Sequence, residues 1–364
     1  MTATVHLVAG ARPNFMKVAP LYHCLSRTDW CRPVFVHTGQ HYDSLLSKTF
    51  LTDLGMPAPD HNLGVGSGSH AEQTAKIMVG YETLCLEEPP DWVVVAGDIN
   101  STMACALAAK KLCLPVAHLE AGLRSGDRTM PEEINRIVTD AVADLLWTPS
   151  PDATDNLCHE GVPAERIDHV GNIMLDAYEM LRGRIEAAAG PAAYDLKPGA
   201  YGIVTLHRPA NVDTRDALSL VVEALVGCAD LLPLLFPVHP RTAGALERFG
   251  LADTLRDAGI RMLPPLGYVD FLALVSQARA VITDSGGIQE ETTYLGIPCL
   301  TLRDTTERPI TINQGTNRLV TARNVVRTLA GILEDGAGAG RRPDLWDGRT
   351  AGRVAASLQR HLGD

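Results

Sequence analysis

The hydrophobic positions of this chain follow two alternating periodicities. Short continuous apolar runs, typical of strands buried in a parallel sheet, are separated by longer amphipathic segments typical of helices. In the first half, the predicted strands are residues 5–9, 33–37, 92–96, 115–119, 145–148 and 167–170. The predicted helices are residues 15–26, 42–54, 70–86, 101–112, 132–143 and 173–189. This alternation predicts right-handed βαβ units and a parallel sheet covered on both faces.

A composition shift at residues 190–199, which include Pro191, Pro198 and two glycines, marks a candidate boundary. The alternation then restarts, with predicted strands at residues 201–206, 231–238, 260–263, 280–283 and 299–302 and a last helix over 349–362. We therefore predict an α/β protein with two doubly wound, Rossmann-like domains facing a central cleft. The predicted domains are residues 1–172 and 173–348, and residues 349–364 form a closing helix that can return to the first domain.

Composition narrows the class of protein. The 364 residues suit two domains, and the net charge of −11 argues against bulk binding of nucleic acid or anionic membrane. No apolar run approaches the roughly 20 residues of a membrane helix, and residues 1–9 lack the features of a signal peptide, so we expect a cytoplasmic enzyme. The eight cysteines show no C-x-x-C pattern and predict reduced core residues. The histidines show no zinc pattern, and we expect no metal.

Residues 280–309 predict a nucleotide-diphosphate site. A buried strand is followed by Ser285, Gly286 and Gly287, and the helix that opens there can turn its backbone N–H groups toward a phosphate. Ser285 can cap this helix or donate to the same oxygen. Glu291, expected on the first helical turn, can bind the hydroxyls of a sugar, and Arg308 can bind phosphate through two hydrogen bonds. The alternative is an ordinary strand-to-helix corner.

Further polar residues follow other predicted strands, where parallel sheets bind ligands. Asp98 and Glu120 follow neighbouring strands, and two such carboxylates can serve as acid and base because proximity separates their pKa values. The simpler alternatives are a helix cap for Asp98 and a salt bridge to Arg124 for Glu120. For Glu132, the alternative is a favourable charge at a helix start.

Histidines and cations extend this predicted site. His207 ends a strand at the cleft and can titrate near neutrality, and His239 follows the next strand. His118 lies inside a strand, which favours a satisfied core histidine. Arg12 and Lys17 follow the first strand and suit a diphosphate, although Lys17 fits a solvated helix position equally well. Glycines 64, 66 and 68 follow residues 57–63, which do not predict a strand, so they do not form a dinucleotide-binding fingerprint.

Together these segments resemble the non-hydrolysing UDP-N-acetylglucosamine 2-epimerases. The resemblance spans nearly the whole chain in order. It is carried by Arg12-Pro13 with Lys17, Gly97-Asp98, residues 118–124 (HLEAGLR), residues 131–136 (PEEINR), His207-Arg208, residues 237–239 (PVH), residues 283–291 and residues 303–309.

The resemblance implies a fold shared with many UDP-sugar glycosyltransferases, no nicotinamide or other cofactor, and usually a homodimer. It implies interconversion of UDP-N-acetylglucosamine and UDP-N-acetylmannosamine through loss and return of UDP. The implied acid and base candidates are Asp98, Glu120 and Glu132, with the faces they serve left open. The resemblance implies that His207 acts on the leaving phosphate. It also implies a larger set of substrate-binding residues, with Phe271 near uracil and Glu291 on the ribose: Arg12, Lys17, His239, Phe271, Ser285, Gly286, Gly287, Glu291 and Arg308.

The sequence departs from the family's pattern after His207 and at positions of the family's regulatory site. His207 is followed by Arg208-Pro209-Ala210-Asn211 instead of two arginines, a glutamate and an asparagine, and Gln40-His41 continues with Tyr42-Asp43-Ser44. No arginine occurs in residues 67–73. These departures predict that activation by UDP-N-acetylglucosamine is lost. The rival functions are a hydrolysing 2-epimerase, a UDP-sugar glycosyltransferase and a nucleotide-sugar sensor, and the sugar could carry further modifications.

Overall fold

The computed structural model describes residues 2–40, 51–335 and 340–362 and divides into two compact units. The first unit contains Met1–Met180 and Asp344–Asp364, and the second contains Leu181–Pro343. The contacts between residues divide the chain after residues 180 and 343. The boundaries predicted from the sequence are residues 172 and 348. Most of the helix predicted over residues 42–54 lies outside the described residues.

The first unit is built on a parallel sheet of seven strands in the order β3-β2-β1-β4-β5-β6-β7. Its strands are β1 (Ala3–Ala9), β2 (Cys31–His37), β3 (His61–Asn62), β4 (Trp92–Ala96), β5 (Val116–Leu119), β6 (Leu145–Thr148) and β7 (Ile167–His169). The prediction of no strand over residues 57–63 is wrong, because β3 pairs there with β2. Two residues are too few to produce a recognisable apolar run.

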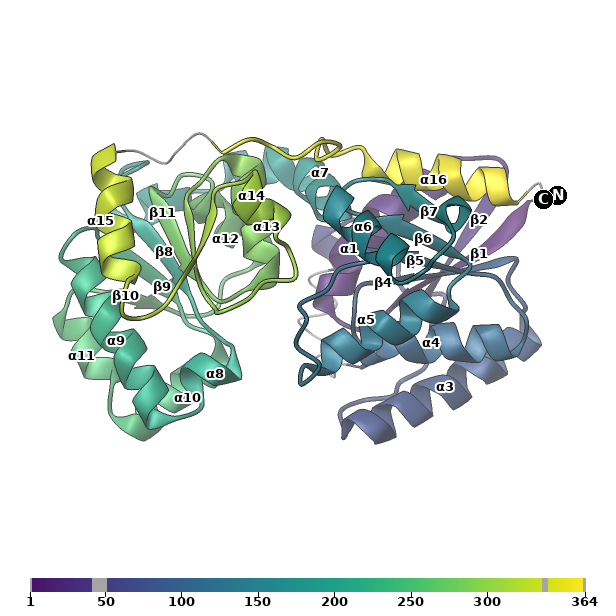
Figure 1. Ribbon diagram of the computed structural model, residues 1–364, viewed down its shortest axis with the longest axis horizontal. Helices are drawn as coiled ribbons and strands as arrows, with labels where there is room; N and C mark the ends of the chain where they lie inside the picture. The colour runs from purple at the N-terminus through teal and green to yellow at the C-terminus, as the bar shows by residue number, and fades with distance from the viewer. Residues whose placement is uncertain (1, 41–50, 336–339, 363–364) are drawn as a thin grey trace. The chain divides into compact units, whose positions relative to one another are not determined.

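Helices cover both faces of this first sheet, as Figure 1 shows for α3, α4 and α5 on one face and α1 and α16 on the other. The helices are α1 (Arg12–Leu25), α3 (His70–Glu87), α4 (Asn100–Lys111), α5 (Pro131–Val142), α6 (Pro151–His159) and α16 (Thr350–His361), with α7 (Ile173–Ala187) running across the unit boundary. The closing helix α16 packs against α1. Asp176 fixes its start by accepting hydrogen bonds from the backbone N–H groups of Thr350 and Ala351, at 3.0 and 2.7 Å.

The second unit repeats the plan with a parallel sheet of six strands in the order β10-β9-β8-β11-β12-β13. Its strands are β8 (Gly202–Thr205), β9 (Leu234–Pro237), β10 (Arg261–Leu263), β11 (Ala280–Thr283), β12 (Cys299–Leu302) and β13 (Asn317–Val320). The sequence analysis missed β13. Its residues Asn317 and Arg318 interrupt the apolar run that identifies the other strands.

The second sheet is also covered on both faces, with α9 and α15 on one and α12 and α13 on the other (Figure 1). The helices are α8 (Pro209–Val212), α9 (Arg215–Ala229), α10 (Pro240–Phe249), α11 (Ala252–Asp257), α12 (Tyr268–Val275), α13 (Gly286–Leu295), α14 (Ile310–Asn313) and α15 (Val325–Asp335). Residues of β8, α9 and α15 form a continuous apolar core. The predicted α/β fold with two doubly wound parallel sheets is confirmed.

The two strand orders locate the places where each unit can bind a ligand. In both sheets the order reverses beside the unit's first strand, between β1 and β4 in one and between β8 and β11 in the other. The carboxyl ends of strands at such a reversal form a crevice for ligands in open α/β sheets. The segments after β1, β4, β8 and β11 therefore carry the candidate chemistry.

The prediction for the cysteines also has an outcome. All eight cysteines are free, as predicted, and most are buried, although Cys113 and Cys158 are exposed. Within the described ranges, no helix is both long and apolar enough to cross a membrane. The same part of the chain holds no group of three or more histidine, cysteine, aspartate or glutamate residues that could bind a metal ion.

Candidate active site

At the carboxyl edge of the first sheet, Glu120 pairs with a lysine. The ammonium of Lys17 on α1 contacts Glu120 Oε2, and both side chains are buried. Arg12 is the first residue of the same helix. The alternative salt bridge from Glu120 to Arg124 is wrong, since Arg124 pairs with other carboxylates. Lys17 is likewise no solvated helix residue, and its charge is directed at a candidate catalytic carboxylate.

The backbone at Glu120 is unusual for a residue with a side chain. Its φ is +74°, in the left-handed region, a conformation that costs on the order of 1–3 kcal/mol for such a residue. Hydrogen bonds from the backbone N–H groups of Glu120 and Ala121 to the Trp147 carbonyl hold it there. Gly97 stands beside it with a φ of +69°, and a Cβ at Gly97 would lie 2.5 Å from Lys17 Nζ. Both the left-handed backbone and the closeness of the Lys17 ammonium therefore favour glycine at this position.

Asp98, which follows Gly97, is held by a buried arginine. Arg136 Nη1 donates to Asp98 Oδ2 at 2.5 Å, and its Nη2 donates to Glu133 Oε2 at 2.7 Å. Asp98 remains partly exposed, with 29% of its side chain accessible, whereas Arg136 is 2% exposed. The alternative role of Asp98 as a helix cap is wrong, because α4 begins at Asn100 and Ile99 occupies its N-cap.

The adjacent glutamates at the start of α5 have different environments. Glu133 is buried and accepts hydrogen bonds from the backbone N–H groups of Ser125 and Gly126. Burial raises the pKa of Glu133, but these donors and Arg136 outweigh burial and lower it. Glu132 is half-buried, and its side chain has no hydrogen bond or ion pair with any residue that the structure describes. Glu133 therefore holds the loop, and Glu132 is the carboxylate available for chemistry.

In the second unit, His207 and Asp284 follow the strands β8 and β11, beside the reversal of strand order. His207 Nδ1 lies 3.1 Å from Asp284 Oδ1, and Asp284 is fully buried. Burial raises the pKa of Asp284, but His207, Asn211 and the Arg208 backbone outweigh burial and hold it below its ordinary value. Because Nδ1 faces this carboxylate, Nε2 is the ring nitrogen left for a ligand.

His239 stands next to His207, with 5.6 Å between ring centroids. It is the N-cap of α10, where its Nδ1 accepts from the Arg241 backbone N–H at 3.2 Å. In the neutral ring the proton of His239 is therefore on Nε2. Two imidazoles thus occupy the ends of the neighbouring strands β8 and β9.

The start of α13 has the features of an anion site. No side chain among the described residues caps this helix, so Ser285 is its N-cap residue without a capping hydrogen bond. A Cβ at Gly286 would lie 2.8 Å from Arg308 Nη1, so glycine permits the guanidinium to approach the helix. Gly287 has open space where a Cβ would be. Backbone N–H groups and a guanidinium therefore meet where the helix dipole favours negative charge.

Arg308 is oriented by two carboxylates. It pairs with Glu307 Oε1 through Nη1 at 2.5 Å and with Glu290 Oε1 through Nε at 2.9 Å. Burial raises the pKa of Glu307, but Arg308 and Arg303 outweigh burial and lower it strongly. This network fixes the plane of the Arg308 guanidinium beside the start of α13.

Glu291 is a buried carboxyl group on the second turn of α13, so its predicted place on the first turn is wrong. Burial raises the pKa of Glu291 to about 8, with Glu290 adding to the rise and the Tyr268 hydroxyl opposing it. That hydroxyl donates to Glu291 Oε1 at 2.8 Å. Phe271 lies three residues after Tyr268 on α12 and is half-buried, and residues at this spacing share a helix face.

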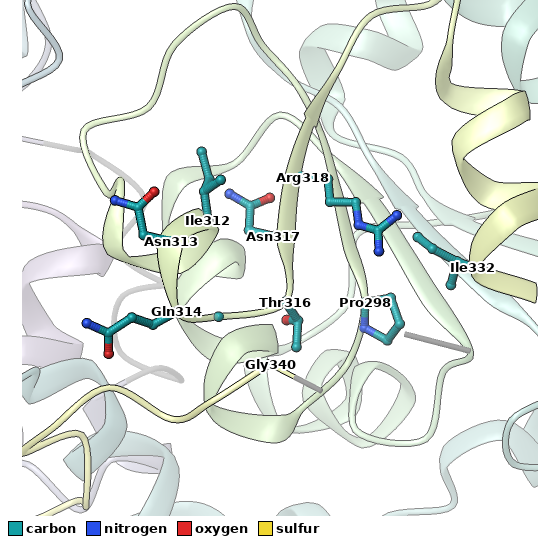
Figure 2. A pocket seen from close by; sticks show the side chains of 10 residues that line it. Pro298, Ile312, Asn313, Gln314, Thr316, Asn317, Arg318, Ile332 and Gly340 are labelled. Carbon is teal, nitrogen blue, oxygen red and sulfur yellow. The ribbon is translucent and has the colours of Figure 1, made fainter. Parts of the chain in front are cut away.

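A cavity of about 360 Å³ lies elsewhere in the second unit. Figure 2 shows Asn313 and Gln314 on one side and Arg318 with Ile332 on the other. Pro298 and Thr316, which line it, immediately precede β12 and β13. The cavity is therefore at the amino ends of the strands, away from the edge that carries His207 and Ser285.

Comparison with known proteins identifies the family. A family model described as UDP-N-acetylglucosamine 2-epimerase matches residues 23–359. The chain belongs to this family. It is 42% identical over 322 residues to the UDP-N-acetylglucosamine 2-epimerase of Methanocaldococcus jannaschii, covering 86% of this chain and 87% of the relative. A UDP-2,3-diacetamido-2,3-dideoxy-D-glucuronate 2-epimerase of Pseudomonas aeruginosa is 40% identical over 318 residues, covering 86% and 87%.

Solved structures of family members have the same fold. The crystal structure of the Methanocaldococcus jannaschii enzyme in complex with UDP-GlcNAc and UDP has a TM-score of 0.89 at 38% identity and covers 98% of this chain and 99% of that one. The Neisseria meningitidis enzyme bound to UDP-GlcNAc has a TM-score of 0.87 at 26% identity, covering 98% and 100%. The resemblance inferred from the sequence is confirmed.

Three residues that contact predicted site residues were not among the functional candidates of the sequence analysis: Asp284, Arg136 and Tyr268. Each orients a predicted residue, through the contacts of Asp284 with His207, Arg136 with Asp98 and Tyr268 with Glu291. These partners are 77, 38 and 23 residues apart in the chain. Arg136 and Asp284 lie in segments that carry the family resemblance, and Asp284 also directly follows a buried strand.

Proposed function

We propose that the protein interconverts UDP-N-acetylglucosamine and UDP-N-acetylmannosamine by inverting C2 of the sugar. Family membership supports this reaction, as do relatives named for it and solved with UDP-GlcNAc bound. The observation that carries the proposal is the set of three carboxylates on the first unit, with Asp98 and Glu120 each paired to a buried cation and Glu132 without a partner among the described residues. Binding of a UDP-sugar alone would not require this set.

The chemistry explains why such a set is needed. The C2 hydrogen of the sugar is not acidic, because no carbonyl group is attached to that carbon. As the C1–O bond breaks, its electron pair leaves with UDP, and a base removes the C2 proton to form the C1–C2 double bond of 2-acetamidoglucal. An acid then protonates C2 from the opposite face, and the UDP oxygen attacks C1. The product is the C2 epimer, and exchange of protons with solvent returns the base and the acid to their starting protonation states.

Proton transfer at two faces of C2 requires two protein groups. Asp98, Glu120 and Glu132 are the proposed acid and base, and the face that each serves stays open. A positioned acid or base is typically worth about 100- to 10,000-fold in rate. Arg136 and Lys17 orient two of the three carboxylates.

The second unit is proposed to hold UDP before and after the bond breaks. The uncapped start of α13 with Ser285, Gly286 and Gly287 suits the diphosphate, and Arg308 adds a planar, oriented cation. His207, oriented by Asp284, can stabilise or protonate the leaving phosphate through Nε2. Retention of UDP beside the glycal distinguishes this reaction from hydrolysis.

The remaining substrate contacts follow from the same arrangement. Glu291 with Tyr268 is proposed to hold the ribose hydroxyls, and Phe271 on the same helix to lie near uracil. Arg12, Lys17 and His239 are proposed to contribute further polar contacts to the UDP-sugar. We also propose a homodimer located in the cytoplasm, and sedimentation equilibrium tests the first of these two statements.

A modified UDP-sugar is the second candidate substrate. The relative from Pseudomonas aeruginosa, named for a UDP-2,3-diacetamido-2,3-dideoxy-D-glucuronate, is nearly as similar to this chain as the relative named for UDP-N-acetylglucosamine. The deciding experiment incubates the purified protein with each sugar nucleotide and resolves the products by proton NMR. A second UDP-sugar formed from UDP-N-acetylglucosamine supports the proposal. If only the diacetamido sugar nucleotide is turned over, it replaces UDP-N-acetylglucosamine as the proposed substrate. Release of free sugar would indicate a hydrolase.

A further inference from the structure

His118 is a buried histidine whose two ring nitrogens both face acceptors. Nδ1 lies 2.6 Å from Asp140 Oδ1, and Nε2 lies 2.8 Å from the Gly97 carbonyl oxygen. The side chains of His118 and Asp140 are 0% and 1% exposed. Because a carboxylate and a carbonyl can only accept, both ring nitrogens donate and the ring carries two protons. The predicted satisfied core histidine is confirmed, but its two partners have further connections.

Asp140 uses its second oxygen on a different turn. Oδ2 accepts from the Gly122 backbone N–H at 3.0 Å and pairs with Arg124 Nη1 at 2.7 Å. Arg124 in turn forms a two-point contact with Glu160, with both distances 2.7 Å. The His118–Asp140 pair therefore connects the Gly97 turn to the Gly122 turn.

These two turns carry the candidate catalytic carboxylates. Gly97 directly precedes Asp98, and Gly122 lies two residues after Glu120. Gly97, Glu120 and Gly122 all have left-handed backbones, with φ of +69°, +74° and +81°. Left-handed backbone is sparsely populated by residues with side chains and persists only where surrounding contacts hold it. His118 contacts Gly97, the residue before Asp98, and Asp140 contacts Gly122, two residues after Glu120.

We propose that the His118–Asp140 pair is a positioning unit that sets Asp98 and Glu120 relative to each other. The inference rests on the proposed function of these carboxylates in proton transfer at C2. A buried ion pair contributes little net stability compared with well-packed apolar residues, so orientation is the role that its geometry supports. Neither His118 nor Asp140 touches substrate in this account; both act through the backbone of the two turns.

Two substitutions each release one turn. His118→Asn can keep a donor near Asp140 but loses the reach to the Gly97 carbonyl, and Asp140→Asn can place an amide N–H against the Gly122 N–H. Because a displaced catalytic group can cost up to about 100-fold, we expect kcat to fall roughly 10- to 100-fold in each variant. KM should change little, because the proposed contacts to the diphosphate at α13 and to the ribose are on the second unit, whereas both turns are on the first. A fall in kcat/KM of the same size that comes only from a higher KM, with kcat unchanged, would contradict a positioning role.

His6→Asn is the matched control. His6 is also a buried histidine in the same sheet, on β1, but its ring bonds Tyr81 and neither carboxylate turn. We expect this variant to keep kcat near that of the wild type even if its melting temperature falls. The inference is overturned if folded His118→Asn and Asp140→Asn keep wild-type kcat, or if His6→Asn loses as much.

A measurement on the wild-type protein covers the case in which the His118 variants do not fold. Nitrogen-15 NMR of labelled histidine should show a slowly exchanging, hydrogen-bonded proton on each ring nitrogen of His118, because each faces an acceptor. One unprotonated nitrogen would overturn the inference. This test needs no turnover, so it separates the positioning unit from the proposed function, whose own failure would appear as absence of epimerisation by the wild type.

Discussion

His207 Nδ1 lies 3.1 Å from Asp284 Oδ1. His207 follows β8 and Asp284 follows β11, and the strand order of the second sheet reverses between these two strands. The backbone N–H of His207 also donates to Asp284, at 3.0 Å. One buried carboxylate thus fixes both the main chain and the ring of the histidine proposed to act on the leaving phosphate. The arrangement resembles other sites in which an aspartate orients a catalytic histidine.

Asp284→Asn should lower kcat by roughly 100-fold or more, because an amide can stabilise the wrong tautomer of the His207 ring. UDP affinity, measured by titration calorimetry, should fall much less than kcat. Asp213→Asn is the control, since Asp213 forms an exposed pair with Arg241 and such pairs contribute little. Wild-type turnover by folded Asp284→Asn would remove Asp284 from the account.

Asp98→Asn, Glu120→Gln and Glu132→Gln should each lose at least about 100-fold in turnover while still binding UDP, because each removes a proposed proton-transfer group. The neighbouring pair Glu132 and Glu133 gives the sharpest comparison. Glu132→Gln should keep the melting temperature and lose activity, whereas Glu133→Gln should lower the melting temperature because the buried Arg136 and two backbone N–H groups lose their charged acceptor. The reverse pattern would exchange their roles.

Glu291 should make the free energy of unfolding fall as pH rises. Burial raises the pKa of its carboxyl group from 4.5 to about 8, so between these values the folded protein binds more protons than the unfolded chain. Denaturant unfolding across this range should therefore show a steeper loss of stability for the wild type than for Glu291→Gln. The exposed Glu223→Gln is the control and should parallel the wild type. Parallel curves for all three proteins would show that Glu291 does not titrate in this way.

Turnover of UDP-N-acetylmannosamine should follow a simple hyperbola without a lag. By the resemblance, the sequence departs from the family's pattern after His207 and has no arginine in residues 67–73, and Gln40 Oε1 accepts from Ser101 Oγ within the first unit at 2.7 Å. Residues 41–44, which also carry this expectation, lie outside the described part of the chain. Progress curves from pure UDP-N-acetylmannosamine test it. A lag abolished by a trace of UDP-N-acetylglucosamine would show that activation is retained.

The sequence predicted the architecture because buried parallel strands leave strong local signals. It missed β3, which has two residues, and β13, whose Asn317 and Arg318 interrupt the apolar pattern. These strands are recognisable through pairing with β2 and β12, which is not a local property.

The sequence predicted which residues form the candidate site but not which residues they contact. Asp98, Glu120 and His207 were found because each follows a strand. The sequence could not show that Lys17 contacts Glu120 from 103 residues away, nor that Glu120 adopts a left-handed backbone. These features depend on tertiary contacts, and they distinguish an oriented carboxylate from an ordinary salt bridge or helix cap.

Incubation with UDP-N-acetylglucosamine in deuterated water, without an acceptor and followed by proton NMR, tests the central claim most directly. If a base removes the C2 proton and an acid returns one from solvent, a second UDP-sugar appears and deuterium accumulates at C2. The account predicts both changes in the wild type and neither in Glu120→Gln at comparable times. Epimer formation without deuterium at C2, or release of free sugar with UDP, would contradict it.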